Sequence, residues 1–271
     1  MQILTANPAG NITVFVLDPV ESRAERADIA RAIMKEKRFG AEQVGFVTPP
    51  FHNFHKKNLW HLEMAGGEFC GNAARSFGLY VARHHLRSEG EPGVKETLFV
   101  SVSGAEEPVK VVVDAEKGRA AAEMPKPTSI DTLPFKNNSL PVIVFEGITH
   151  IIALDMEPAE ENFYTILGVY KSGAEIPAAI GVMFYDTAAG FMKPAVYVRS
   201  IDSFVFESSC GSGTAALGAW LSRSLSEGCA RYAISQPGGV IEAEIQKKTG
   251  EITGITIGGE VKLGESEAFY S

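Results

Sequence analysis

The sequence contains little cysteine: Cys70, Cys210 and Cys229 are its three copies in 271 residues. So few and so widely spaced, they exclude a scaffold built on disulfides. No two of them form a Cys-x-x-Cys pair, which would indicate a zinc or redox motif. We therefore expect three reduced thiols and no metal site.

The sequence also lacks an excess of positive charge and any long hydrophobic run. Its 25 Lys and Arg against 33 Asp and Glu give a formal net charge of -8. A nucleic-acid or anionic-membrane partner requires a dense basic face, so we expect neither. No apolar segment approaches the roughly 18 residues of a membrane span, and the first twenty residues show no basic leader followed by an apolar segment. We expect a cytosolic protein.

What the sequence does contain is many short apolar segments separated by Gly, Pro and Asn. The composition, 45% hydrophobic and 21% charged, is typical of a globular protein, and the length suffices for one large domain or two ordinary ones. The patterns predict strands at residues 11–18, 44–50, 97–104, 108–116, 139–146, 149–156, 179–186, 195–207 and 251–263. They predict helices at residues 21–37, 72–86, 159–171 and 213–228. This is an α+β fold.

An internal repeat links the two halves of the chain. Shifting the sequence by 140 positions superimposes three pairs of residues: Cys70 with Cys210 and Gly71 with Gly211, just before a predicted helix, and Gly78 with Gly218 inside it. A repeat of this kind predicts two similar domains, with a boundary in the proline-containing segment 123–134. We assign residues 1–120 and about 258–271 to the first domain and residues 121–257 to the second.

A cysteine at the start of a helix has a specific chemical environment. The first backbone N–H groups of a helix have no partner within it, and the macrodipole is positive there. Both effects favour a thiolate and also favour a bound carboxylate. We therefore expect the thiol pKa of Cys70 and Cys210 to fall from about 8.5 toward neutrality. For Cys229 we expect an ordinary buried side chain.

Two such helix starts, facing one another across a cleft, would suit racemisation or epimerisation. One sulfur, as thiolate, would remove the α-proton of an amino acid, while the other, as thiol, would deliver a proton to the opposite face. The paired helix dipoles would stabilise the developing enediolate. This chemistry requires no pyridoxal phosphate.

Other interpretations remain open at this point. A Cys–His hydrolase could use one thiol with His61 or His150 as base, but it leaves the second cysteine unexplained. A non-catalytic module could use the helix starts only to bind an amino acid. A run of Gly211, Gly213 and Ala216 gives a weak dinucleotide motif without the required acidic residue. His61, His84 and His85 are expected at the surface rather than as metal ligands. Glu63 and Glu68 are expected in solvated or capping positions, with Glu68 able to cap the helix that follows.

The two cysteine segments, "EFCGNA" and "SCGSGTA", resemble the motifs of the diaminopimelate epimerase and proline racemase superfamily. Within it, "NPAGNITVFV", "EQVGFV" and "QPGG" are most similar to the histidine racemases of staphylopine-type metallophore pathways. The resemblance implies two pseudo-symmetric domains, each a β-barrel-like sheet around a central helix. It also implies a homodimeric enzyme that needs no cofactor. This enzyme would supply D-histidine for an opine metallophore.

The resemblance assigns roles to ten residues. It implies that Cys70 and Cys210 are the acid/base pair. The expected substrate-binding residues are Asn11, Gln43, Gly71, Asn72, Gly211 and Ser212, with Glu42 and Glu207 as specificity residues.

Departures from diaminopimelate epimerase bear on the substrate. No Arg follows Glu207. Ile148 stands at the position where the resemblance places an Asn in diaminopimelate epimerase. The approach to the first cysteine is shorter, so Glu63 or Met64 replaces another Asn. Without these donors a second substrate carboxylate would be buried unpaired. Diaminopimelate is therefore disfavoured. Glu42 and Glu207 could accept from an α-ammonium or an imidazole N–H, and the resemblance implies histidine as the favoured substrate, with diaminopimelate or another amino acid as the alternative.

Overall fold

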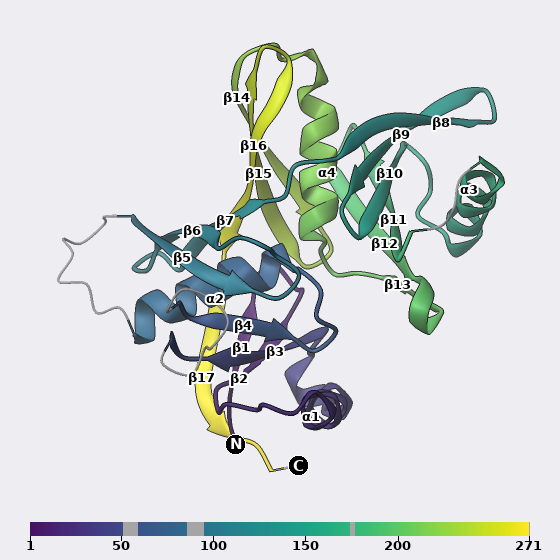
Figure 1. Ribbon diagram of the computed structural model, residues 1–271. Helices are drawn as coiled ribbons and strands as arrows, with labels where there is room; N and C mark the ends of the chain where they lie inside the picture. The colour runs from purple at the N-terminus through teal and green to yellow at the C-terminus, as the bar shows by residue number, and fades with distance from the viewer. Residues whose placement is uncertain (51–58, 86–94, 174–176, 271) are drawn as a thin grey trace. The chain divides into compact units, whose positions relative to one another are not determined.

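The computed structural model describes residues 1–50, 59–85, 95–173 and 177–270. The chain divides into two compact units, one formed by Met1–Glu123 with Gly258–Ser271 and the other by Met124–Ile257. Both are rich in strands and poor in helices, so the predicted α+β class is confirmed (Figure 1). None of the helices in the described ranges is long and apolar enough to cross a bilayer.

The first unit places two helices on a mixed sheet. Its elements are β1 (Gln2–Asn7), β2 (Thr13–Val16), α1 (Arg23–Lys35), β3 (Gln43–Thr48), β4 (His61–Met64), α2 (Gly71–His84), β5 (Glu96–Val102), β6 (Val109–Asp114), β7 (Arg119–Met124) and β17 (Lys262–Ala268). Strand β1 lies between β2 and β17 and is antiparallel to both, so the two ends of the chain are paired. Helix α1 connects the parallel strands β2 and β3. Helix α2 connects the parallel strands β4 and β5.

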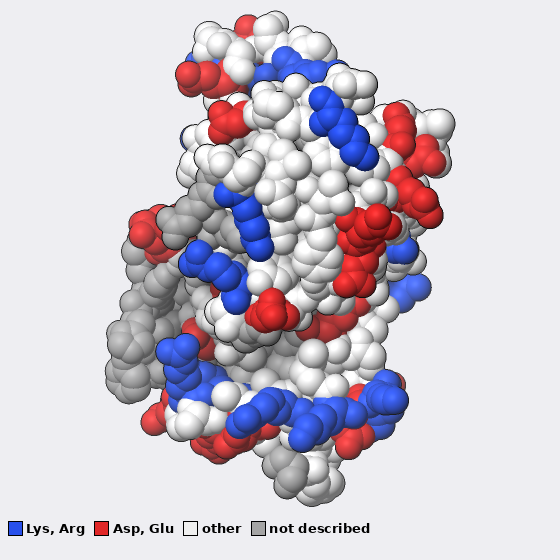
Figure 2. All heavy atoms as spheres, turned by 90° about the vertical axis from the view of Figure 1, so that its right-hand side faces the viewer, with Lys and Arg blue, Asp and Glu red and all other residues white. Residues whose placement is uncertain are grey.

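The two helices pack against this sheet in different hydrophobic clusters. Helix α1 begins after Ser22, whose hydroxyl accepts from the Glu25 N–H, and it buries Ile29 and Ile33 against strand residues that include Phe46. Its other face is charged, and Figure 2 shows a row of Lys and Arg at the level of α1, with Asp and Glu between them. In α2, by contrast, every residue from Gly71 to Ala82 is buried. A helix that is covered all round forms the centre of its domain.

The second unit repeats this plan. Its elements are β8 (Ser129–Phe135), β9 (Asn138–Phe145), β10 (Ile148–Leu154), α3 (Glu160–Gly173), β11 (Ala179–Asp186), β12 (Phe191–Val198), β13 (Ser203–Phe206), α4 (Gly211–Leu221), β14 (Gly228–Gln236) and β15 (Gly239–Lys248), and β16 (Glu251–Glu260) follows. Helix α3 connects the parallel strands β10 and β11, as α1 connects β2 and β3. Helix α4 then begins at a cysteine, as α2 does. Among the described residues the sheet remains open rather than closing into a barrel.

The predicted elements at 195–207 and 213–228 extend past breaks that the structure shows. The strand expected at 195–207 is divided into β12 and β13 by a 3-10 turn at Arg199–Ile201, which ends at Asp202 in a left-handed conformation (φ 47°). The Tyr197 hydroxyl donates to the Asp202 carboxylate over 2.8 Å and holds this turn. The helix expected to reach residue 228 ends at Leu221, because Ser222–Ser224 tighten into a 3-10 turn.

The glycines shared by the two cysteine helices have a packing role. A Cβ at Gly78 of α2 would lie 2.5 Å from Cγ1 and 2.9 Å from Cβ of Val111 on β6. A Cβ at Gly218 of α4 would lie 2.9 Å from Cβ of Ala243 on β15. Both distances are shorter than van der Waals contact, so glycine is what allows each helix to approach its strand.

This close approach predicts different effects of alanine at two helical glycines. We expect Gly78→Ala to lower the free energy of unfolding by about 1–3 kcal/mol, because the stiff Val111 side chain cannot move aside in a packed core. The control is Gly168→Ala in α3, where a Cβ has no atom within 4 Å. There we expect a gain of about 0.5–1 kcal/mol from helix propensity. Denaturant titration measures both, and equal effects would contradict the packing role.

Candidate active site

Each of the two cysteines is itself the N-cap of its helix. Cys70 has φ -127° and ψ 112°, and its sulfur accepts from the Ala73 N–H over 3.4 Å. Cys210 has φ -126° and ψ 115°, and its sulfur accepts from the Gly213 N–H over the same distance. The cysteine, not Glu68, therefore caps α2. In both units the sulfur lies at the positive end of a helix, and the preceding N–H groups of the first turn have no partner within the helix.

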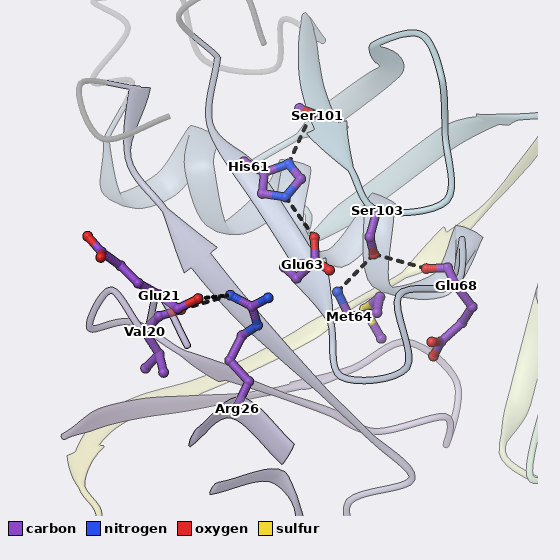
Figure 3. A network of polar contacts seen from close by, with 9 residues as sticks. All are labelled: Val20, Glu21, Arg26, His61, Glu63, Met64, Glu68, Ser101 and Ser103. Carbon is purple, nitrogen blue, oxygen red and sulfur yellow. Dashed lines mark hydrogen bonds and ion pairs between the residues drawn. The ribbon is translucent and has the colours of Figure 1, made fainter. Parts of the chain in front are cut away.

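The loop before Cys70 is fixed by the turn that follows β5. The Ser103 hydroxyl accepts from the Met64 N–H over 2.9 Å and donates to the Glu68 carbonyl over 3.0 Å, so it joins both ends of the turn that leads to the cysteine (Figure 3). The next residue, Gly104, has φ 71°, and a Cβ there would clash with the Phe69 backbone N. The Cys70 backbone therefore sits where β5 ends.

Burial dominates the ionisation of Cys70. Removal from water raises the pKa of this thiol to about 11, and the negative charge of Glu68 adds to the effect. The Ala73 N–H and the Gln43 side chain oppose it by hydrogen bonding to the sulfur. The expected fall toward neutrality is therefore wrong, because desolvation outweighs the helix start. In the absence of substrate, Cys70 holds its proton at neutral pH.

The Cys210 thiol also has a raised pKa, but different residues surround it. It is 6% exposed, and burial raises its pKa well above the ordinary value, with the Glu207 carboxylate adding to the rise. The Ser212 hydroxyl and the Gly213 N–H lower it. The Cys210 N–H donates to the Gln236 side-chain oxygen over 2.8 Å, which fixes the backbone at the helix start.

A chain of polar side chains lies beside Cys70 in the first unit. The Asn11 amide donates to the Glu42 carboxylate over 2.9 Å, and the Asn72 amide donates to the Asn11 oxygen over 3.4 Å. Asn72 accepts in turn from Arg75 over 3.1 Å. Arg75 is fully buried and also donates to the carbonyls of Pro8 and Glu260, over 3.1 and 3.2 Å. This chain ties the first turn of α2 to the loop before β2.

Gln43 has an acceptor that the described residues leave unused. Its side chain hydrogen bonds to the Cys70 sulfur and lowers the pKa of that thiol, so its amide N–H is the donor. Its Oε1 atom is buried and has no hydrogen-bond partner among the described residues. A buried oxygen without a partner costs free energy unless a ligand donates to it. It is therefore a candidate acceptor for a donor group of a ligand.

A second polar chain reaches Cys210 in the other unit. His150 of β10 is fully buried, and its Nε2 lies 2.9 Å from the Ser212 hydroxyl oxygen. That oxygen lies 3.5 Å from the Cys210 sulfur. Burial lowers the pKa of the His150 imidazole to about 3, so the ring is neutral. Its hydrogen bond goes to Ser212, which does not favour a direct Cys–His hydrolase dyad.

The predicted site residues gather in two groups. Around Cys70 the structure brings together Asn11, Glu42, Gln43, Gly71 and Asn72. Around Cys210 it brings together Glu207, Gly211 and Ser212.

Sequence reasoning missed Arg75 as part of the first group. It is the one basic residue in the buried part of α2, which runs from Gly71 to Ala82. A cation at that position in an apolar helix was a usable indication of a buried polar network.

Two further expectations need correction. Cys229 is exposed at the start of β14, not buried, because the helix ends before it and its strand faces solvent. His61 is partly buried rather than at the surface. Figure 3 shows it between Ser101 and Glu63, with Nδ1 2.9 Å from the Ser101 hydroxyl and Nε2 3.1 Å from the Glu63 carboxylate. His84 and His85 are exposed as predicted.

Comparison with known proteins places the chain in one family. The model of the histidine racemase CntK N-terminal domain matches residues 1–270. A histidine racemase of Fusobacterium nucleatum subsp. nucleatum is 34% identical over 255 residues, covering 91% of this chain and 90% of the relative. One from Staphylococcus aureus is 29% identical over 241 residues, covering 87% and 85%.

A solved structure shows the same fold at low identity. The crystal structure of a probable proline racemase from Agrobacterium radiobacter K84 has a TM-score of 0.62 and 13% identity, covering 99% of this chain and 92% of that one. At this identity the similarity concerns the fold alone. The family match and the histidine racemase relatives identify the chain as a member of the histidine racemase CntK family and as an amino-acid racemase.

Proposed function

We propose that the protein is a cofactor-independent histidine racemase in which Cys70 and Cys210 are the two acid/base groups. The observation that supports this most is the duplicated cap. Two cysteines, one in each unit, begin buried helices with φ and ψ values that agree within a few degrees, and both sulfurs accept from the third N–H that follows. An inert structural cysteine has no reason to recur in this form.

The proposed reaction moves one proton off the α-carbon and another onto it. One cysteine, as thiolate, takes the α-proton and becomes a thiol, and the electron pair passes into the carboxylate to give an enediolate. The second cysteine, as thiol, then gives its proton to the opposite face and becomes the thiolate. The enzyme ends in the state that accepts the other enantiomer. This mechanism requires the two units to present their thiols to opposite faces of one α-carbon.

The high thiol pKa values suit this chemistry. The α-proton of an amino acid is a weak acid, so a strong base is required, and a desolvated thiolate is a stronger base than an exposed one. The substrate supplies a positive ammonium group that favours the thiolate once it is bound. The first N–H groups of α2 and α4, at Gly71, Asn72, Gly211 and Ser212, are donors for the carboxylate and for the enediolate charge.

Substrate recognition is assigned to groups beside each cysteine. The unpaired Oε1 of Gln43 can accept from the ammonium group next to Cys70. Glu42 is held by Asn11 and, like Glu207 near Cys210, offers a carboxylate to an imidazole N–H. The names of the relatives, all histidine racemases, agree with such a set of acceptors. Diaminopimelate is disfavoured, because no Arg accompanies Glu207 in the sequence. We place the product, D-histidine, in opine metallophore synthesis on family resemblance.

Replacing either proposed base should slow racemisation strongly. We expect Cys70→Ser and Cys210→Ser each to lower the racemisation rate of L-histidine by more than about 100-fold, because a serine hydroxyl is a far weaker acid than a thiol. Optical rotation follows racemisation, and NMR in deuterated water follows α-deuterium incorporation. Cys229→Ser, at an exposed thiol, is the control and should be unaffected. If both site variants kept wild-type rates, the two-base assignment would be wrong.

The raised thiol pKa predicts a steep pH dependence. Without substrate, the alkylation rate of Cys70 by iodoacetamide should rise about tenfold per pH unit from pH 7 to 9 without a plateau, because the thiolate fraction grows in this way below the pKa. Peptide mass spectrometry reports Cys70 alone, and the protein unfolded in guanidinium is the control, with a midpoint near 8.5. A plateau below pH 9 in the folded protein would contradict burial as the dominant effect.

The burial of Cys70 also has a consequence for stability. Its folded pKa is above its unfolded value, so the stability it contributes is present below the unfolded value and is lost as pH rises toward about 11.

The carboxylate assignment predicts a selective loss of binding. We expect Glu42→Gln to raise the KM for histidine about tenfold, since a hydrogen bond to a charged group becomes a neutral one. The matched control is Glu63→Gln, which removes a carboxylate bonded to His61 on β4 and should leave KM unchanged. Steady-state kinetics with both enantiomers measures the effect. A Glu42 variant with unchanged KM would remove this residue from substrate recognition.

A further inference from the structure

We propose that His150 is a positioning residue that holds the Ser212 hydroxyl so that its proton points at the Cys210 sulfur. This inference rests on the proposed function, because it explains how one of the two cysteines is prepared to act as a base. It adds a residue that does not itself touch the reacting thiol.

The fold makes a dedicated space for the His150 ring. His150 is 0% exposed on β10, and the parallel register with β11 places Gly181 beside it. A Cβ at Gly181 would lie 2.5 Å from the Nδ1 atom of His150, so any larger residue there would displace the ring. The Phe145 ring contacts it edge-on, with centroids 6.2 Å apart. The imidazole is therefore fixed with Nε2 directed at Ser212.

The unused ring nitrogen determines the direction of the hydrogen bonds. The neutral ring carries one proton, either on Nδ1 or on Nε2. Nδ1 is buried and has no partner among the described residues. A buried N–H without an acceptor is rarer in proteins than a buried acceptor without a donor, so the proton belongs on Nε2. Nε2–H then donates to the Ser212 oxygen, and the Ser212 proton is free to point at the Cys210 sulfur, 3.5 Å away.

The direction of the Ser212 O–H matters because the groups near Cys210 have opposite effects on the stability of its thiolate. The Glu207 carboxylate disfavours a thiolate, whereas the Gly213 N–H and the Ser212 hydroxyl favour it. The His150 ring adds no charge, since burial keeps it neutral, and so it acts only through Ser212. The Ser212 hydroxyl therefore offsets part of the effect of Glu207, provided that His150 keeps it oriented.

The first unit contains a corresponding arrangement. Asn72 stands two residues after Cys70, as Ser212 stands two residues after Cys210, and its side chain is held by Asn11 over 3.4 Å. Asn11 lies just before β2, the strand that corresponds to β10. In each unit, then, a residue at or just before the corresponding strand, β2 or β10, hydrogen bonds to the second residue after the cysteine. The partners differ: an amide in the first unit and an imidazole in the second.

The test measures the reactivity of Cys210 in the full-length protein without substrate. Iodoacetamide alkylation of the Cys210 peptide is followed by mass spectrometry from pH 7 to 10. We expect Ser212→Ala to slow it about tenfold at a fixed pH below the thiol pKa, since a hydrogen bond to the thiolate is lost. We expect His150→Asn to slow it similarly, because the shorter amide does not reach Ser212. His150→Gln, whose amide nitrogen can occupy the position of Nε2, should restore the rate.

Several outcomes would overturn the inference. Unchanged alkylation in Ser212→Ala would show that the hydroxyl does not donate to the sulfur, and faster alkylation would show that it accepts from the thiol instead. Equal rates in His150→Gln and His150→Asn would show that the donor at Nε2 is irrelevant. Cys70 alkylation, measured in the same digests, should not change, and thermal unfolding checks that each variant is folded.

Racemisation provides a separate measurement. The acidic limb of the kcat/KM profile for histidine should move to higher pH in Ser212→Ala and His150→Asn but not in His150→Gln. The alkylation result does not depend on turnover. If Cys210→Ser remained fully active while alkylation responded as expected, the proposed function would fail and the orientation of Ser212 by His150 would stand.

Discussion

The structure of both units depends on a sulfur that caps a helix while being removed from water. The two requirements act against each other, because the helix start favours a negative charge on the sulfur and burial opposes it. At Cys70 and Cys210 burial has the larger effect. Cys210 is buried and Cys70 partly buried, each at the start of a helix that lies close to a strand through a glycine contact. The packing of each core therefore sets the acidity of the thiol at its edge.

The sequence predicted the elements that create these two environments. The 140-residue repeat located both cysteines at helix starts, and the helices α1, α2 and α3 lie within two residues of their expected bounds. These predictions succeeded because helix periodicity and the repeated Cys-Gly pair are local properties of the chain. The strands β1, β4, β7, β8, β14 and β15 were not predicted, because their sequences interleave apolar residues with many polar or small ones and carry a weaker pattern. The split of β12 from β13 depends on a left-handed residue that no periodicity indicates.

The candidate site was predicted less completely, for reasons that concern burial. The ten site residues were chosen for their place in the motifs, and the structure groups eight of them around the two cysteines. Arg75 was missed because its role comes from acceptors at Pro8 and Glu260, which are distant in sequence. The thiol pKa was misjudged because desolvation is a property of the folded core. His150 was considered only as a direct base, since its bond to Ser212 depends on strand register.

The two caps have almost the same backbone geometry but different companions, with a carboxamide at Cys70 and a hydroxyl held by an imidazole at Cys210. Racemisation has an equilibrium constant of one, so the specificity constants for the two enantiomers must be equal whatever the site is like. Unequal companions cannot change that ratio. In the proposed two-base mechanism, they can only decide which sulfur keeps its proton longer at rest, and hence which enantiomer reaches its maximal velocity at the lower concentration. The similar backbone of the two caps therefore suits a reaction that runs equally in both directions. The different side chains beside them would affect only the separate kinetic constants of the two enantiomers.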